Sequence, residues 1–159
     1  MITLVPMKEA DFAWYHEHLA VAYAQDQVES GEWDQASALQ HAKDSIARLL
    51  PNGLATPDNR LYLLLAGGNP DPVGQLWVTL HPGAYPSAFI LDIEIYAPYQ
   101  RKGYAKQALQ ALEALVRPLG IFKIGLHVHA SNPGAKALYE KMGYGVTGFD
   151  MIKRLDSSE

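Results

Sequence analysis

Residues 90–115 constrain the fold of this chain more than any other stretch. They read as a short apolar strand, a turn, the basic segment 100–105, and a helix rich in alanine and leucine. Backbone N–H groups at the start of a helix lack partners and the macrodipole is positive there, so this position binds phosphate groups. Gly103 has no Cβ to hold a ligand away from the backbone, and Arg101 and Lys102 add positive charge. The stretch therefore predicts a phosphate-bearing cofactor at the turn.

Residues 100–105 resemble the Q/R-x-x-G-x-G/A signature of the GNAT superfamily of N-acetyltransferases, which binds the pyrophosphate of acetyl-CoA in those enzymes. Residues 126–128, Asn132 and residues 135–144 resemble the second half of the family at the expected distance. Ala105 stands where glycine is commoner, which the pattern allows. The resemblance implies an acetyl-CoA-dependent N-acetyltransferase that acts on a primary amine by direct attack in a ternary complex, without a metal.

Composition and charge place the chain among ordinary globular proteins. Its 159 residues are 48% hydrophobic and 19% charged, and a formal net charge of -4 gives no general basic surface for nucleic acid. The absence of cysteine excludes disulfides, thiolate zinc sites and cysteine nucleophiles. No apolar run is long enough to cross a membrane, and Lys8, Glu9 and Asp11 interrupt any signal peptide. We expect one cytoplasmic domain over residues 1–159, without nucleic-acid or membrane partners; a homodimer is left open.

The hydrophobic periodicity predicts the element order β-α-α-β-β-β-α-β-α-β. Strands are expected at residues 2–5, 61–66, 73–81, 89–96, 123–129 and within 144–155, and helices at 9–29, from an N-cap at Asp34 to about 50, at 104–118 and at 133–142. The strand–helix–strand unit makes the strands around Ile93 and Val128 parallel neighbours. The sequence therefore predicts an α+β fold with a mixed, mostly antiparallel sheet and flanking helices, the order that GNAT enzymes show.

The resemblance also implies where acetyl-CoA binds. In the GNAT family the two parallel strands splay apart to admit the cofactor, and a bulge in the first of them commonly frees backbone groups for the pantetheine arm. The implied cofactor-binding residues are Ile93, Glu94, Ile95, Gln100, Arg101, Lys102, Gly103, Tyr104, Ala105, Asn132 and Tyr139.

Tyr139 is the candidate general acid, because it lies where many GNAT enzymes carry the tyrosine that protonates the leaving sulfur. A phenol with a pKa near ~10 is reasonably matched to a thiolate leaving group. Tyr139 could instead pack its helix onto the sheet. Asn132 has two compatible roles, as the helix N-cap and as a contact to the amide arm of the cofactor.

The candidate general bases are Glu94 and His127, ranked nearly level, with Asp92 behind them. His127 lies on the strand where some family members carry a catalytic glutamate, and histidine accepts a proton near neutral pH. Asp92 and Glu94 interrupt an apolar strand, where buried charge is costly unless it lines a cleft or pairs with a cation. A structural histidine bonded to a backbone carbonyl is the competing interpretation of His127.

The acceptor is weakly specified. Two histidines two residues apart, His16 and His18, project from different sides of a helix, so we expect a solvated face rather than a metal site. The region between the first helices carries an acidic, aromatic set that would suit a cationic amine, although an ordinary solvated turn is favoured: Asp26, Glu29, Glu32, Trp33 and Asp34. Trp77 and Tyr85 are candidate pocket walls.

Two other functional classes stay open. A non-catalytic acyl-CoA sensor would keep residues 100–105 without needing Tyr139 or a base. A nucleotide-binding protein could use the same turn, but the P-loop signature G-x-x-x-x-G-K-[ST] is absent. The acceptor of an enzyme could be a small molecule or an amine of a peptide or protein.

Overall fold

The computed structural model describes residues 1–155 of the chain. The chain divides into two compact units, Met1–His127 and Val128–Glu159. The first unit contains a five-stranded sheet and three long helices, and the second contains one helix, α4 (Pro133–Lys141).

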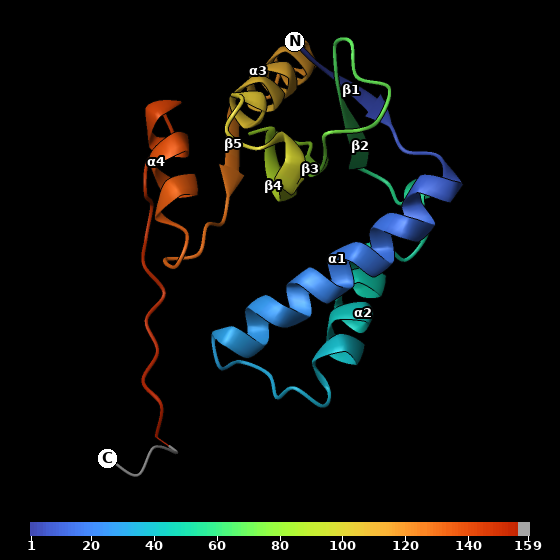
Figure 1. Ribbon diagram of the computed structural model, residues 1–159. Coiled ribbons are helices and arrows are strands. Elements are labelled where there is room, and N and C mark those ends of the chain that lie inside the picture. Colours follow the sequence, from blue (N-terminus) through green and yellow to red (C-terminus); the bar gives the residue numbers. More distant parts are fainter. Residues whose placement is uncertain (156–159) are drawn as a thin grey trace. The chain divides into compact units, whose positions relative to one another are not determined.

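The elements of the first unit follow the predicted order (Figure 1). They are β1 (Ile2–Pro6), α1 (Glu9–Glu29), α2 (Ala38–Leu49), β2 (Asn59–Ala66), β3 (Gly74–His81), β4 (Ser87–Ile95), α3 (Tyr104–Val116) and β5 (Lys123–Leu126), with short 3-10 turns at Gly53–Ala55, Ala97–Tyr99 and Arg117–Leu119. The strands lie in the order β1-β2-β3-β4-β5, antiparallel except for the parallel pair β4–β5. This confirms the α+β fold with a mixed, mostly antiparallel sheet.

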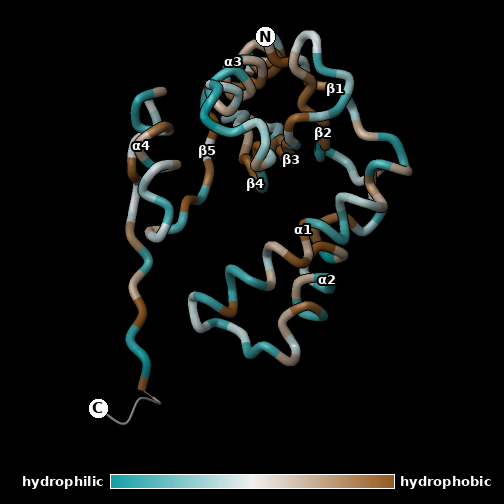
Figure 2. Tube along the Cα trace, in the orientation of Figure 1, coloured by the Kyte–Doolittle hydropathy of each residue, from teal (hydrophilic) through white to brown (hydrophobic). Residues whose placement is uncertain are grey.

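One face of the sheet packs against α1 and α2. These two helices lie beside each other (Figure 1). Hydrophilic and hydrophobic residues both occur along α1 (Figure 2), and its buried side chains are Tyr15, Ala20 and Ala24. Tyr15 of α1 and Ile46 of α2 are buried in one cluster with Leu61 of β2 and Trp77 of β3. This cluster fixes α1 over β3 and β4, where the candidate site lies.

The opposite face of the sheet is covered by α3, which contacts β1 and β4. Its buried residues recur at helical spacing: Ala108, Leu109, Leu112 and Val116. The helix begins after Gly103, whose φ of 80° lies in the left-handed region that favours glycine. The predicted glycine turn at the start of this helix is therefore confirmed as a structural feature.

Three local predictions need correction. The second helix begins at Ala38, because Asp34 Oδ1 accepts hydrogen bonds from the backbone N–H (2.9 Å) and hydroxyl (2.7 Å) of Ser37 and so closes a turn before the helix. The strand expected at residues 123–129 ends at Leu126. No strand is found at residues 144–155 in the part of the chain that the structure describes, where two glycines, Gly145 and Gly148, weaken β propensity.

Candidate active site

A β-bulge in β4 determines which way the candidate carboxylates point. Ile90 pairs with Val78 and Asp92 with Trp77, so Leu91 is an extra residue in the ladder. Leu91 packs against the α1–α2 core and Asp92 contacts α1, so two successive residues face the same side. Without the bulge, strict alternation would turn Asp92 away from α1, onto the face of Ile90.

Six side chains join in one hydrogen-bonded group beneath α1, which we call the polar network: Tyr15, His18, Gln75, Asp92, Glu94 and Tyr96. They come from α1, β3, β4 and the residue that follows β4. All six lie in the first unit. The network therefore depends on the packing of α1 against the sheet.

Gln75 is the centre of the polar network and is only 1% exposed. Its Oε1 accepts a hydrogen bond from the Tyr96 hydroxyl at 2.7 Å. Its Nε2 donates to Asp92 Oδ2 at 3.0 Å and to Glu94 Oε1 at 3.1 Å. Since a side-chain amide has two N–H donors on its nitrogen, Gln75 holds both carboxylates at once.

Asp92 forms the half of the network that is held by a buried tyrosine. The hydroxyl of Tyr15, which is 0% exposed, donates to Asp92 Oδ2 at 2.8 Å. Burial raises the pKa of Asp92 above its ordinary value, while the hydrogen bonds from Tyr15 and Gln75 oppose that rise. Burial, followed by the nearby charge of Asp92, raises the pKa of Tyr15 well above its ordinary value, so Tyr15 remains a neutral donor. Asp92 is held by two donors inside the fold and is suited to a positioning role.

Glu94 forms the accessible half. Its side chain is 38% exposed, and His18 Nε2 lies 2.7 Å from Glu94 Oε1. An ionised carboxylate only accepts, so against it His18 Nε2 acts as the donor. Burial, and then the carboxylates of Glu94 and Asp92, raise the pKa of Tyr96, which keeps its proton for Gln75. Glu94 therefore presents a carboxylate that solvent and a substrate can reach.

The turn after β4 has the geometry expected of a phosphate site. Arg101 and Gly103 have φ values of 63° and 80°, and alternation of left-handed residues with ordinary ones points successive N–H groups to one side. The first turn of α3 carries no acidic residue and no side-chain cap. A Cβ built on Gly103 would approach nothing closer than Gln107 Nε2, at 4.0 Å, so the space beside the turn is open. Gln100 holds the turn to β4 by donating from Nε2 to the carbonyl oxygen of Ile95 at 2.9 Å.

The β5 edge of β4 also leaves backbone groups for a ligand. The parallel ladder runs only from Ser87 to Ile90 within residues 1–155, so the later part of β4 extends beyond it. The N–H of Tyr96 donates to Val73 on the β3 side at 2.8 Å. Because strand N–H groups alternate, those of Ile93 and Ile95 point to the β5 side and that of Glu94 points to β3. The geometry favours Ile93 and Ile95 over Glu94 as backbone donors.

The remaining predicted site residues lie beyond this group. His127 is exposed and follows the end of β5. In the second unit, Asn132 Oδ1 accepts from the N–H of Ala135 at 3.1 Å, which confirms it as the N-cap of α4. Tyr139 packs edge-on against Tyr144, with ring centroids 5.7 Å apart. The catalytic and cofactor roles of His127, Asn132 and Tyr139 stay predictions.

Sequence reasoning missed four of the network residues: Tyr15, His18, Gln75 and Tyr96. The expectation that His18 lies on a solvated face is wrong, because it bonds Glu94. A signal was present, since His18 follows Tyr15 by three residues, and residues three apart share a helix face. Gln75, in turn, is the one polar side chain in the buried run 73–78, which is unusual unless it has hydrogen-bond partners.

Three residues that were candidates for the acceptor site have different environments in the structure: Trp33, Trp77 and Tyr85. Trp33 packs edge-on against Tyr23 and tilted against His41, each 5.2 Å away, which supports the ordinary helix–helix turn. Trp77 is 2% exposed and donates to Asn59 Oδ1 at 2.8 Å, so it belongs to the core rather than to a pocket wall. Tyr85 is exposed, and it does not line the cavity that adjoins the polar network, which is described next.

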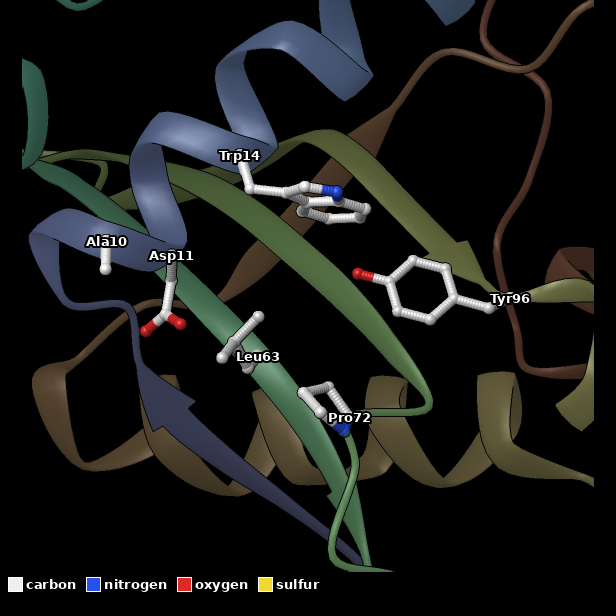
Figure 3. Close-up of a pocket in the computed structure, with 6 residues that line it drawn as sticks. All are labelled: Ala10, Asp11, Trp14, Leu63, Pro72 and Tyr96. Carbon is white, nitrogen blue, oxygen red and sulfur yellow. The ribbon is translucent and has the colours of Figure 1, made fainter.

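That cavity has a volume of about 290 Å³ (Figure 3). Its lining residues are Ala10, Asp11, Trp14, Leu63, Pro72 and Tyr96. The indole of Trp14 stacks on His18, with ring centroids 4.6 Å apart and planes 13° from parallel. The cavity therefore adjoins the network through two residues, Trp14 and Tyr96.

Neither a cluster of candidate metal ligands nor a helix that could span a membrane is found within residues 1–155. No group of three or more histidine and acidic side chains in this part of the chain is arranged to hold a metal ion. Every helix described is too short or too polar to span a membrane.

Comparisons with known proteins identify relatives over nearly the whole chain. The Acetyltransferase (GNAT) family matches residues 10–144. The chain is 41% identical over 156 residues to the Uncharacterized N-acetyltransferase YycN of Bacillus subtilis, covering 97% of this chain and 99% of YycN. It is 32% identical to the Uncharacterized N-acetyltransferase YdgE of the same organism, covering 96% of this chain and 98% of YdgE. The crystal structure of YycN matches with a TM-score of 0.92 at 40% identity, covering 99% of this chain and 100% of that chain.

Proposed function

Because the chain belongs to the Acetyltransferase (GNAT) family, we propose that it transfers an acetyl group from acetyl-CoA to a primary amine, with Glu94 as general base. The observation that carries this proposal is the layout of β4. A bulge at Leu91, an accessible carboxylate at Glu94 and the turn at residues 100–105 follow one another along the chain. The proposed base and the proposed phosphate-binding turn therefore lie at the two ends of one short segment, residues 94–105.

The residues around the turn fit acetyl-CoA. Gly103 leaves room for a diphosphate against the backbone, and the N–H groups at the start of α3 and the cations Arg101 and Lys102 complement its charge. The N–H groups of Ile93 and Ile95 would bind the amides of the pantetheine arm. When bound, acetyl-CoA supplies the thioester whose carbonyl carbon is attacked by the amine.

Glu94 has a defined task in this reaction. An alkyl amine with a pKa near ~10.4 is mostly protonated at neutral pH and must lose a proton to become a nucleophile. Glu94 accepts that proton, while Gln75 and His18 hold its Oε1 in place. Tyr139 donates the proton that the leaving sulfur needs as the N–C bond forms and the C–S bond breaks. Positioning of the two reactants supplies much of the rate, ~7–11 kcal/mol in well-oriented cases.

Glu94 is preferred to His127 as the base on two grounds. Glu94 lies in the polar network with two side-chain partners that fix its orientation, and it is on the strand that leads to the phosphate turn. His127 follows the last residue of β5 and is exposed. A base that is fixed before the substrate binds loses less entropy in the reaction.

The proposal is tested with purified protein, acetyl-CoA and a panel of primary amines and peptide N-termini, by following the release of free CoA thiol. We expect release above background with at least one amine, and calorimetry should show binding of CoA but not of ATP. Absence of CoA release across the panel, together with no measurable affinity for CoA, would overturn the proposal.

A further inference from the structure

We propose that the cavity beside the polar network binds the side group of the acceptor, and that the acceptor is a small primary amine carrying one apolar or aromatic group. This inference deepens the proposed function and rests on it. The cavity lies between the N-terminal half of α1, β2, the loop before β3 and the end of β4. In Figure 3 the rings of Trp14 and Tyr96 lie on one side of it, and Leu63 and Pro72 on another.

Two short chains of contacts place the cavity next to the proposed base. Trp14 stacks on His18, and His18 Nε2 lies 2.7 Å from Glu94 Oε1. Tyr96 donates to Gln75, whose amide donates to the same Glu94 oxygen. Each aromatic wall of the cavity is therefore one residue away from the Glu94 carboxylate. The proposal requires that a side group held against these walls directs its amine toward Glu94.

The chemistry of the lining selects the side group. None of the six lining residues is basic, and all but Asp11 offer aliphatic or aromatic surface. The rings of Trp14 and Tyr96 meet edge-on, with centroids 5.9 Å apart. An acceptor with a carboxylate or phosphate here would lose its hydration without gaining a cation.

Asp11 is the one charged residue of the lining and suggests a rival acceptor, a diamine. Its Oδ2 accepts a hydrogen bond from the backbone N–H of Lys8 at 2.9 Å, as part of the capping box of α1. The carboxylate thus already has a structural partner at the helix start. Apart from Asp11, the cavity is apolar, so it would have to surround the charged second ammonium group of a diamine, which is unfavourable. An apolar side group matches this lining.

Size and exposure agree with a small ligand. Sites for small molecules occupy about 300–1,000 Å³, so a cavity of about 290 Å³ holds one small group rather than a long chain. Trp14 is 52% exposed, which is unusual for so large an apolar side chain. A ligand in the cavity would cover part of this surface.

The test compares three acceptors that differ only in the group attached to the amine: 2-phenylethylamine, the diamine cadaverine, and methylamine, which is too small to fill the cavity. We expect kcat/KM for CoA release to be highest for 2-phenylethylamine, by about tenfold or more over either of the others. In Trp14→Ala, KM for 2-phenylethylamine should rise about tenfold, while kcat/KM for methylamine changes less than about twofold. Val21→Ala is the matched control, an exposed apolar residue of α1 outside the cavity, and should leave all three values unchanged.

A second variant tests the cavity without touching the stack on His18. Ala10→Leu fills the cavity from α1 and should raise KM for 2-phenylethylamine but not for methylamine. The inference is overturned if cadaverine is the preferred acceptor, or if Trp14→Ala lowers the rates for methylamine and 2-phenylethylamine equally, which would mean that Trp14 acts only through His18. CoA release without any preference among the three amines would refute this inference alone. No release from any amine in the wider panel would refute the proposed function instead.

Discussion

At the scale of single residues, Asp92 and Glu94 have the same chemistry and different environments. Both are anchored by Gln75, but Asp92 also receives the hydroxyl of a fully buried tyrosine, while Glu94 meets a partly exposed histidine. Burial disfavours the charged form of a carboxylate, and exposure lets it exchange protons with a substrate. The two residues therefore divide into one that holds the network and one that is available for reaction.

This division predicts the effect of Glu94→Gln. The amide cannot accept the proton of the amine, so kcat/KM for CoA release should fall by about 10²–10⁴. The affinity for acetyl-CoA, measured by calorimetry, should change little. His127→Gln is the matched substitution at the rival base and should cost less than about tenfold. A larger loss in His127→Gln than in Glu94→Gln would reverse the assignment of the base.

Asp92 predicts a pH dependence of stability with a definite sign. Its pKa in the folded state is raised above the ordinary 3.8, so the folded state binds its proton more tightly than the unfolded chain does. The contribution of this tighter proton binding to the free energy of unfolding is fully present below about pH 3.8. It is lost as the pH rises through the raised pKa of Asp92. Because Asp92→Asn removes this loss, the free energy of unfolding of the variant relative to wild type should increase from about pH 4 to about pH 7.

Asp34→Asn is the control with the opposite sign. Hydrogen bonds from the side chain and backbone of Ser37 lower the pKa of Asp34, so its contribution is present above its ordinary pKa and lost as the pH falls. Relative to wild type, the stability of Asp34→Asn should therefore decrease as the pH rises toward about 3.8 and stay level above it, whereas that of Asp92→Asn increases above about pH 4. Urea unfolding at several pH values measures both variants. Parallel trends in the two would contradict the difference in environment.

At the scale of elements, the backbones of the paired strands β3 and β4 approach each other closely at Gly74. A Cβ at this position would clash with the carbonyl oxygen of Glu94 on the paired strand. Gly74→Ala should destabilise the protein by ~1–3 kcal/mol, or about 2–4 °C in Tm for each kcal/mol, and should lower activity by displacing Glu94. Gly67→Ala is the control, since nothing lies within 4 Å of a Cβ there. Equal Tm values for the two variants would refute the close approach.

The start of α3 gives a second prediction at this scale. Gly103 and Gly120 both have φ of 80° and neither would place a Cβ closer than 4.0 Å to a heavy atom. Valine at either position therefore carries a similar backbone strain, ~1–2 kcal/mol. Only Gly103→Val should weaken CoA binding, by about tenfold or more, because only Gly103 adjoins the proposed phosphate site. Calorimetry compares the two, and equal CoA affinities would show that the phosphate site is elsewhere.

At the scale of the whole molecule, the sequence predicts what depends on local pattern and misses what depends on packing. The first helix is found at Glu9–Glu29 as expected, because its apolar residues recur at helical spacing, and Gly103 marks the turn before α3. The polar network depends on the bulge at Leu91, which no local pattern encodes, and on α1 lying over β3 and β4. For the same reason the role of Gln75 could not be predicted before the sheet was known.

The proposed mechanism also assigns a role to the second unit, which carries Tyr139, the proposed general acid. In Tyr139→Phe the ring and its packing against Tyr144 are kept, but the proton for the leaving sulfur is lost. We expect kcat to fall by about 100-fold while calorimetry shows CoA affinity within about twofold of wild type. Tyr144→Phe is the matched control: it removes the hydroxyl of Tyr144, whose ring packs against Tyr139, and should retain most of the activity. A sensor of acyl-CoA would not need the hydroxyl proton of either tyrosine. If both variants leave CoA release nearly unchanged, Tyr139 is a packing residue, and the proton for the leaving sulfur must come from another source.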